Sequence, residues 1–133
     1  MQGDLIEIWK PVVGYEELYE VSNLGNVRSF DRIINRPIGA YLKKGRVLRA
    51  GKSRNGYLTV RLVGNEGTST INVHRLVAQA FLDNPNGYNE VNHLDEDKTN
   101  NKANNLEWCT HKYNMNYGTR NKRISSRRNG GKE

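Results

Sequence analysis

Hydrophobic and polar residues alternate most clearly between Tyr57 and Val73. Leu58, Val60 and Leu62 alternate with Tyr57, Thr59 and Arg61, which is the period of a β-strand with one buried face. The turn-forming run Gly-Asn-Glu-Gly comes next, and a second β-prone run rich in threonine leads back along the chain. This pattern predicts a β-hairpin.

Directly after this hairpin the hydrophobic period changes to that of a helix. Leu76, Val77, Ala80 and Phe81 fall on one face of a helix that spans 75–82. The polar run Asp-Asn-Pro-Asn-Gly then ends that helix. The remainder of the pattern predicts two short strands and a second helix, over residues 91–94, 105–109 and 111–117.

The amino-terminal part has no long periodic element. Residues 5–30 read as short strands joined by turns, the clearest of which is the sequence NLGN at 23–26. Residues 31–54 read as irregular and basic, with one short strand predicted in the sequence GRVLRA at 45–50. The tail, 119–133, has almost no apolar residues, and we expect it to be disordered when free. These patterns predict an α+β protein with three parts: 1–55, 56–118 and 119–133.

Charge is distributed unevenly along the 133 residues, whose net charge is +7. Eleven of the 21 lysine and arginine residues lie between Arg28 and Arg75 against two acidic residues, and seven lie from Lys112 onward against one. The segment between these blocks holds six acidic residues and two lysines. Because phosphate contacts supply much of the affinity of DNA-binding proteins, the two basic blocks favour a nucleic-acid partner over a merely basic, water-exposed surface.

The composition limits the remaining classes. No run approaches the roughly 18 apolar residues that a membrane helix needs, and no signal-peptide pattern opens the chain, so we expect a cytoplasmic protein with no membrane partner. A single cysteine, Cys109, fits a reducing compartment. Without paired CxxC ligands we expect no structural zinc, and the alternative is a mixed site of Cys109 with His74, His93 and His111.

The acidic segment 91–114 contains the candidate chemistry. It holds six asparagines, and it places Asn92 and His93 on one predicted strand and Asn114 one turn into the helix that Thr110 caps. If that helix crosses the strand pair, the three side chains converge on one small cleft. Amide oxygens suit a hard cation such as Mg²⁺, which keeps several waters, and a neutral imidazole can take a proton from water.

The spacing NH-x₁₁-NL-x₇-N in this segment resembles the signature of the HNH endonucleases, the ββα-metal nuclease family. The preceding sequence VHRLVAQAFL is similar to the segment that leads into the motif in phage-intron homing endonucleases. The sequence WKPVVGYEELYEVSNLGNVRSF resembles a modular element that accompanies these nucleases and is thought to help grip DNA. The resemblance covers roughly residues 9–30 and 56–117, and its three segments occur in the family's order.

The resemblance implies a role for each matching residue. His93 aligns with the general base, and Asn105 matches the middle asparagine that braces the loop and orients the base; these two form the catalytic set. Asn114 and Asn92 take the positions of the metal ligands for Mg²⁺ or Mn²⁺. Many relatives carry Asp or His where this chain has Asn92, and Asp95 is a possible compensating ligand, directly or through water.

Other positions in the segment have plainer interpretations. Glu96 stands where relatives often carry glycine. Asn100, Asn101 and Asn104 read as loop formers whose side chains replace backbone hydrogen bonds. His74, at the junction of strand and helix, reads as a structural residue or a contact to the DNA backbone.

The same resemblance implies a fold and a function. The fold is a small, hairpin-rich amino-terminal lobe that binds DNA (1–55) followed by a ββα-metal nuclease core (56–118). The function is that of a metal-dependent endonuclease, phage-encoded or of homing type, acting in a bacterial host. It would nick double-stranded DNA as a monomer, leaving 5′-phosphate and 3′-hydroxyl ends, with a dimer needed for double-strand cleavage. The alternatives are a DNA-binding module whose HNH centre is weakened or inactive, and a zinc-ribbon transcription factor, which the single cysteine disfavours.

The DNA contacts are expected from cations of both basic blocks. They are Arg28, Arg46, Arg49, Lys52, Arg54, Arg61, Arg120, Lys122, Arg123, Arg127 and Arg128.

Overall fold

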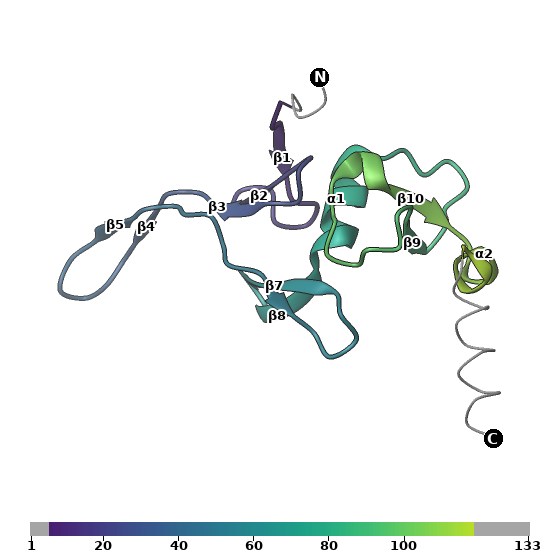
Figure 1. The fold of residues 1–133 in the computed structure, drawn as a ribbon. Coiled ribbons are helices and arrows are strands. Elements are labelled where there is room, and N and C mark those ends of the chain that lie inside the picture. The colour runs from purple at the N-terminus through teal and green to yellow at the C-terminus, as the bar shows by residue number, and fades with distance from the viewer. Residues whose placement is uncertain (1–5, 119–133) are drawn as a thin grey trace.

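The computed structural model describes residues 6–118. The predictions for the tail, including its five DNA-binding cations, lie outside these residues. Figure 1 shows the amino-terminal strands beside the central helix, a long hairpin that projects from them, and the last strands and helix on the opposite side of the central helix. No helix among the described residues is long and apolar enough to cross a membrane.

The amino-terminal part forms a three-stranded antiparallel sheet in the order β1-β2-β3 and a separate hairpin. The predicted short strands of residues 5–30 are therefore confirmed. The bounds of the five strands are β1 Trp9–Pro11, β2 Tyr19–Ser22, β3 Val27–Ser29, β4 Arg32–Ile34 and β5 Tyr41–Lys43.

Two predictions for residues 31–54 are wrong. The stretch contains the projecting β4–β5 hairpin instead of irregular chain, and Pro37 and Gly39, which read as breaks in the sequence, lie in the turn of that hairpin. Neither strand contains a fully buried residue, so no alternation of hydrophobic and polar residues marks them. The strand predicted at 45–50 is reduced to one bridge between Val47 and Arg28.

The central part contains the predicted hairpin and helix. Strands β6, β7 and β8 form a second antiparallel sheet, and helix α1 follows β8 without a loop, two residues earlier than expected. The bounds are β6 Gly51–Lys52, β7 Leu58–Gly64, β8 Gly67–Asn72 and α1 Val73–Phe81.

The last part is a strand pair followed by a helix, as predicted. Thr110 caps α2, since its Oγ1 accepts a hydrogen bond of 3.1 Å from the Tyr113 backbone N–H. The bounds are β9 Glu90–His93, the 3₁₀ turn η1 Ala103–Asn105, β10 Leu106–Cys109 and α2 His111–Asn116.

One hydrophobic core joins these parts around α1. Buried side chains from β2, β7, α1 and β10 pack together, among them Val21, Leu62, Val77 and Leu106. The core therefore draws on residues from both sides of position 55, and the division of the chain at that position stays a prediction. The α+β fold class, with its hairpin-rich amino-terminal part, is confirmed.

Candidate active site

The predicted catalytic and metal-binding side chains meet at the end of the β9–β10 pair. Asn92 lies opposite Glu107 and His93 opposite Leu106 in this antiparallel ladder. Helix α2 packs against β9 and brings Asn114 to the same end. Asn92, His93 and Asn114 line one cavity of about 50 Å³, which has room for a cation and a few waters.

Five further residues, none of which the sequence analysis assigned to the site, also line this cavity: Tyr57, Val91, Glu96, Lys98 and Tyr117. The Lys98 ammonium donates a 2.9 Å hydrogen bond to the Asn55 carbonyl and lies 4.9 Å from the centre of the Tyr57 ring. The sequence contained one indication of Lys98, because it is one of only two lysines between residues 76 and 111, where there are six acidic residues.

His93 is held in one protonation pattern by a buried partner. Its Nε2 lies 2.8 Å from the Asn101 Oδ1. Because an amide oxygen only accepts, the His93 Nε2 must donate, and the lone pair of the neutral ring is on Nδ1. Burial lowers the pKa of His93, although the hydrogen bond that the ring donates to Asn101 and the charge of Asp95 oppose that shift. A neutral imidazole with its lone pair on Nδ1 can act as a base.

The bond to His93 corrects the interpretation of Asn101. Its side-chain oxygen bonds to a histidine ring rather than replacing a backbone hydrogen bond. A buried asparagine in an otherwise exposed loop is visible only in the folded chain.

Asn105 closes the loop that carries Asn101. Its Oδ1 accepts from the Asp95 N–H at 3.1 Å, and its Nδ2 donates to the Asp95 carboxylate and to the Asn100 carbonyl, both at 2.9 Å. These contacts are those of a residue that braces the loop, while its effect on catalysis stays a prediction. Glu96, in the same loop, has a φ of 64°, the left-handed region that glycine tolerates best.

The Asp95 carboxylate is committed to this loop. It accepts hydrogen bonds from the Asn100 and Asn105 side chains and from the Asp97 N–H, and the Asn100 bond is the main reason that its pKa is lowered. Asp95 does not line the cavity, so the structure favours Asn92 over Asp95 as a ligand.

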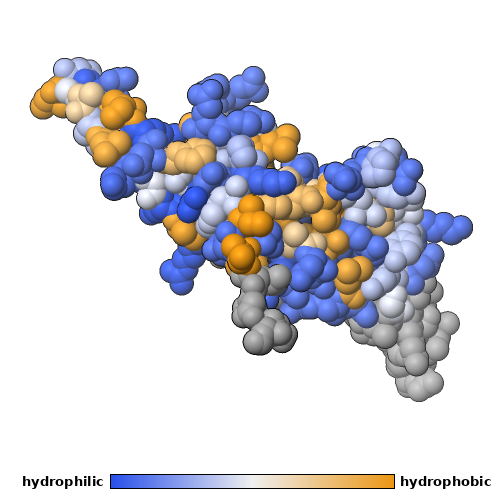
Figure 2. All heavy atoms as spheres, turned by 90° about the horizontal axis from the view of Figure 1, so that it is seen from above, coloured by the Kyte–Doolittle hydropathy of each residue, from blue (hydrophilic) through white to orange (hydrophobic). Residues whose placement is uncertain are grey.

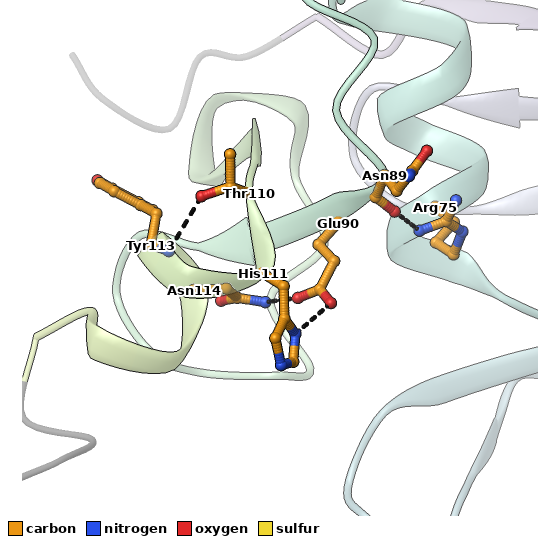
Figure 3. Close-up of polar contacts among 7 residues, drawn as sticks. All are labelled: Arg75, Asn89, Glu90, Thr110, His111, Tyr113 and Asn114. Atoms are coloured by element: carbon orange, nitrogen blue, oxygen red, sulfur yellow. Dashed lines mark hydrogen bonds and ion pairs between the residues drawn. The ribbon is translucent and has the colours of Figure 1, made fainter.

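The two candidate metal ligands are each held by a carboxylate. The Asn92 Nδ2 donates to Glu107 at 2.8 Å, and the Asn114 Nδ2 donates to Glu90 at 2.9 Å. Figure 3 shows Glu90 between Asn114 and His111, whose Nδ1 lies 2.6 Å from the other Glu90 oxygen. Because each amide nitrogen is bound by a carboxylate, a carbonyl oxygen is the atom that can bind a cation.

This donor set fits Mg²⁺ or Mn²⁺. Amide oxygens are hard ligands, and the two carboxylates behind them add negative potential at the cavity. Within residues 6–118, no group of three or more His, Cys, Asp or Glu side chains is arranged to hold a metal ion, so the alternative mixed site with Cys109 is not assembled. Burial raises the pKa of the Cys109 thiol to about 11.

His74 lies behind His93, not at the surface. Its side chain is only 6% exposed, and its Nδ1 is buried without a hydrogen-bond partner among the described residues. Its ring centre is 4.9 Å from that of Tyr57 and 5.0 Å from that of His93. Burial, followed by the charges of His93 and Arg75, lowers the pKa of His74 to about 3. The structural interpretation therefore fits, and a contact to the DNA backbone does not.

The predicted DNA-binding cations form one cluster and several isolated positions. Arg46 and Arg61 line a hollow between the β4–β5 hairpin and β7, together with three cations that the sequence analysis did not name: Arg32, Lys43 and Lys44. No acidic residue within 6–118 lines this hollow, which we call the basic hollow. All three missed residues belong to the same basic block, so their charge was an available signal.

The other predicted cations are not gathered there. Arg28 is bound within the protein, with its guanidinium 2.7 Å from Glu20 and over the Trp9 ring. Arg49, Lys52 and Arg54 are exposed outside the basic hollow.

The projecting hairpin combines charge with apolar surface. In Figure 2 its far end, at the left, carries hydrophobic side chains among hydrophilic ones. Ile38, in the turn between β4 and β5, is 94% exposed. On the strands, Ile33 is 59% exposed and Leu42 is 50% exposed.

Two family models match consecutive parts of the chain. The NUMOD4 motif matches residues 7–63, which include the amino-terminal sheet, the projecting hairpin and most of β7. The HNH endonuclease model matches residues 72–116, which include α1 and the strand pair and helix of the cavity.

Curated relatives are viral. The chain is 37% identical over 117 residues to "Uncharacterized HNH endonuclease L245" of Acanthamoeba polyphaga mimivirus, an alignment that covers 88% of this chain and 31% of that protein. It is 38% identical over 110 residues to the DNA endonuclease I-HmuI of Bacillus phage SP01, with 80% of this chain and 55% of I-HmuI covered. The chain thus spans between about a third and just over half of the length of these relatives.

A solved structure matches over most of both chains. That structure, which concerns DNA binding and cleavage by the HNH homing endonuclease I-HmuI, superposes with a TM-score of 0.65 at 30% sequence identity. The match covers 92% of this chain and 68% of the other. With the NUMOD4 motif, the HNH segment and the ββα arrangement around His93 in one chain, the protein belongs to the HNH endonuclease family of homing-endonuclease type.

Proposed function

We propose that this chain is a metal-dependent endonuclease that hydrolyses one phosphodiester bond in one strand of double-stranded DNA. The observation that supports it best is His93, which lines the cavity with Asn92 and Asn114 and donates its Nε2–H to Asn101, so that the lone pair of the neutral ring is on Nδ1. The relative I-HmuI comes from a Bacillus phage, which favours action inside an infected bacterial cell.

In the proposed reaction, the Nδ1 of His93 removes a proton from water as the water oxygen attacks the phosphorus. The bond between phosphorus and the 3′ oxygen breaks, and the leaving oxygen gains a proton from solvent. The products are a 5′-phosphate and a 3′-hydroxyl, with His93 left protonated. Asn92 and Asn114 would hold the Mg²⁺ or Mn²⁺ ion, and the bound ion supplies charge stabilisation at the phosphate and the leaving oxygen.

One cavity of this kind serves one strand, so a monomer is expected to nick. Supercoiled plasmid incubated with the protein and Mg²⁺ or Mn²⁺ should give open circles before linear DNA, and EDTA should prevent both. A protein that binds DNA yet gives no open circles with either ion supports the second candidate, a DNA-binding module with an inactive HNH centre. That candidate is favoured by one observation: both predicted ligands are neutral amides.

Replacing Asn92 with aspartate should make the stability of the fold depend on divalent cations. The Asn92 Nδ2 donates to Glu107 at 2.8 Å, and Asn92→Asp would place two carboxylates at that distance, where they repel unless a cation or a proton lies between them. We expect the variant to melt a few degrees below wild type in EDTA, since about 1 kcal/mol corresponds to roughly 4–8 °C in a domain of about 60–100 residues and to roughly 2–4 °C in one of about 150–250 residues.

Added Mn²⁺ should recover this loss in a calorimetric melt. Asn104→Asp is the matched control, because it adds the same charge at an exposed position, in the 3₁₀ turn η1 between β9 and β10. An equal response of the two variants to Mn²⁺ would show that the cation does not bind beside Asn92.

The basic hollow should dominate the salt dependence of DNA binding. Arg61→Gln removes one of its five cations, and Lys10→Gln removes the same charge from the exposed face of β1. If Arg61 contacts a phosphate, its loss should reduce the slope of log K against log salt by about 0.9, and Lys10→Gln should leave the slope unchanged. Fluorescence anisotropy over a salt series measures both, and equal slopes in the two variants would remove the basic hollow from the DNA interface.

A further inference from the structure

The turn between β2 and β3 of the amino-terminal sheet lies directly against the HNH loop. The Ala103 N–H donates a 2.8 Å hydrogen bond to the Asn23 carbonyl. A methyl group added at Gly25 would lie 3.2 Å from both the Cβ and the carbonyl oxygen of Asn101. The NUMOD4 segment therefore touches the residue that bonds to His93.

The turn is held rigidly from within. Ser22 is fully buried, and its Oγ accepts from the N–H groups of Leu24 and Asn26 at 3.2 and 3.1 Å. Its own N–H donates to the Asn26 carbonyl at 2.8 Å, and Gly25 takes a φ of 93° to close the turn. With the 3.0 Å hydrogen bond that the Gly25 N–H donates to the Ser22 carbonyl, four hydrogen bonds at one buried serine make the turn a fixed surface for Asn101 to pack on.

The turn is also tied to the chain that precedes it. The Asn23 side chain accepts from the Ile8 N–H at 2.7 Å and donates to the Ile6 carbonyl at 3.0 Å. Asn23 therefore joins the amino-terminal sheet to the HNH loop, through its side chain on one side and its carbonyl on the other.

Asn101 has one buried group that packing alone does not explain. Its side chain is 4% exposed, and its Nδ2 has no hydrogen-bond partner among the described residues. An unpaired buried donor is unfavourable for folding, and an apolar residue of similar size would avoid that cost. What an apolar residue would lose is the Oδ1 that accepts from His93.

From these contacts we propose that Asn101 is a positioning residue that fixes the tautomer of His93, and that the β2–β3 turn holds Asn101 in place to do so. The NUMOD4 segment is then part of the active site and not only a DNA contact. This inference rests on the proposed function for its catalytic meaning, while the tautomer itself is measured independently of cleavage.

The chemical consequence follows from the two nitrogens of the ring. With Asn101 in place the proton is on Nε2 and Nδ1 has the lone pair. Without an acceptor at position 101, the neutral ring is free to carry its proton on Nδ1, and that tautomer cannot take a proton from water at the cavity. A correctly oriented general base contributes roughly 10²- to 10⁴-fold, so cleavage by Asn101→Leu should fall by about 10²-fold or more.

The tautomer is read by ¹⁵N NMR of protein labelled at histidine. The chain has only three histidines, so the ring signals of His93 can be assigned with a His93→Gln sample. At about pH 8, where a neutral ring is observed, wild type should show Nε2–H, Asn101→Asp should keep it because an acceptor oxygen remains, and Asn101→Leu should lose it. A wild-type ring protonated on Nδ1, or an Asn101→Leu spectrum identical to wild type, overturns the inference.

The role of the turn is tested with a matched pair of glycines. Gly25→Ala and Gly14→Ala place a side chain at nearly the same strained φ, 93° and 88°, but the new methyl group meets Asn101 only at position 25 and nothing within 4 Å at position 14. Gly25→Ala should shift the His93 signals toward the Nδ1–H tautomer and Gly14→Ala should not. Identical His93 spectra in the two variants would overturn the part assigned to the turn. If wild type does not cut DNA at all, the proposed function fails, and the NMR result still decides the inference.

Discussion

Replacing His93 with alanine is expected to abolish nicking while leaving DNA affinity nearly unchanged. His93 is the only histidine that lines the cavity formed with Asn92 and Asn114. Burial lowers its pKa, so the ring is neutral and able to accept a proton at neutral pH. Removal of a general base costs roughly 10²- to 10⁴-fold in rate, which takes a nicking enzyme below detection in a plasmid assay.

The measurement compares nicking in Mg²⁺ with DNA binding in EDTA for wild type and His93→Ala. Because the substitution leaves a space the size of the lost ring, added imidazole should restore part of the rate in the variant and have no effect on wild type. Nicking at the wild-type rate by His93→Ala would contradict the assignment of the base, and so would loss of DNA binding in proportion to loss of cleavage.

Acidification should destabilise the fold through His74. The pKa of His74 is about 3 in the folded chain against 6.5 for an ordinary histidine, so the unfolded chain binds more protons between these values. Stability is therefore fully present above pH 6.5 and is lost as the pH falls toward 3. Each pH unit in that window costs about 1.4 kcal/mol, which gives roughly 2 kcal/mol between pH 6.5 and 5, before carboxylates begin to titrate.

Urea unfolding of wild type and His74→Phe at pH 5 and 7 measures this effect. Phenylalanine keeps an aromatic ring against Tyr57 and cannot be protonated, so the variant should lose less stability on acidification than wild type. The free energy of unfolding of the variant should still fall to some extent on acidification, because burial also lowers the pKa of His93. Val77→Ala is the control, since it opens a cavity in the same helix and should lower stability equally at both pH values. The same pH dependence in His74→Phe and wild type would contradict the role of His74.

Much of the fold near the cavity follows from local spacing. The alternation at 58–62 and the change of period after Val73 predict the β7–β8 hairpin and α1, because both patterns depend on neighbours only a few residues apart. The same holds for α2, whose cap is built from Thr110 and Tyr113. The spacing from His93 to Asn114 was also enough to bring those two side chains to one cavity, since a strand pair and a helix leave little freedom between them.

The β4–β5 hairpin was missed for a physical reason. A strand shows a period of two only when one of its faces is buried, and none of residues 32–34 and 41–43 is fully buried. Their alternation therefore carries no signal, and the proline and glycine of the turn resemble interruptions. The basic hollow was missed with it, because Lys43 and Lys44 reach Arg61 only once the hairpin is placed beside β7.

The partners of the catalytic residues depend on contacts that no local pattern describes. Gly25 lies against Asn101, which is 76 residues later in the chain. His74, at the start of helix α1, packs behind His93 on strand β9. Sequence spacing was sufficient to identify the family and to name a candidate base, since both depend on one continuous motif. Which nitrogen of that base carries the proton depends on a buried amide and on the turn that supports it, and those come together only when the amino-terminal sheet packs on the HNH loop.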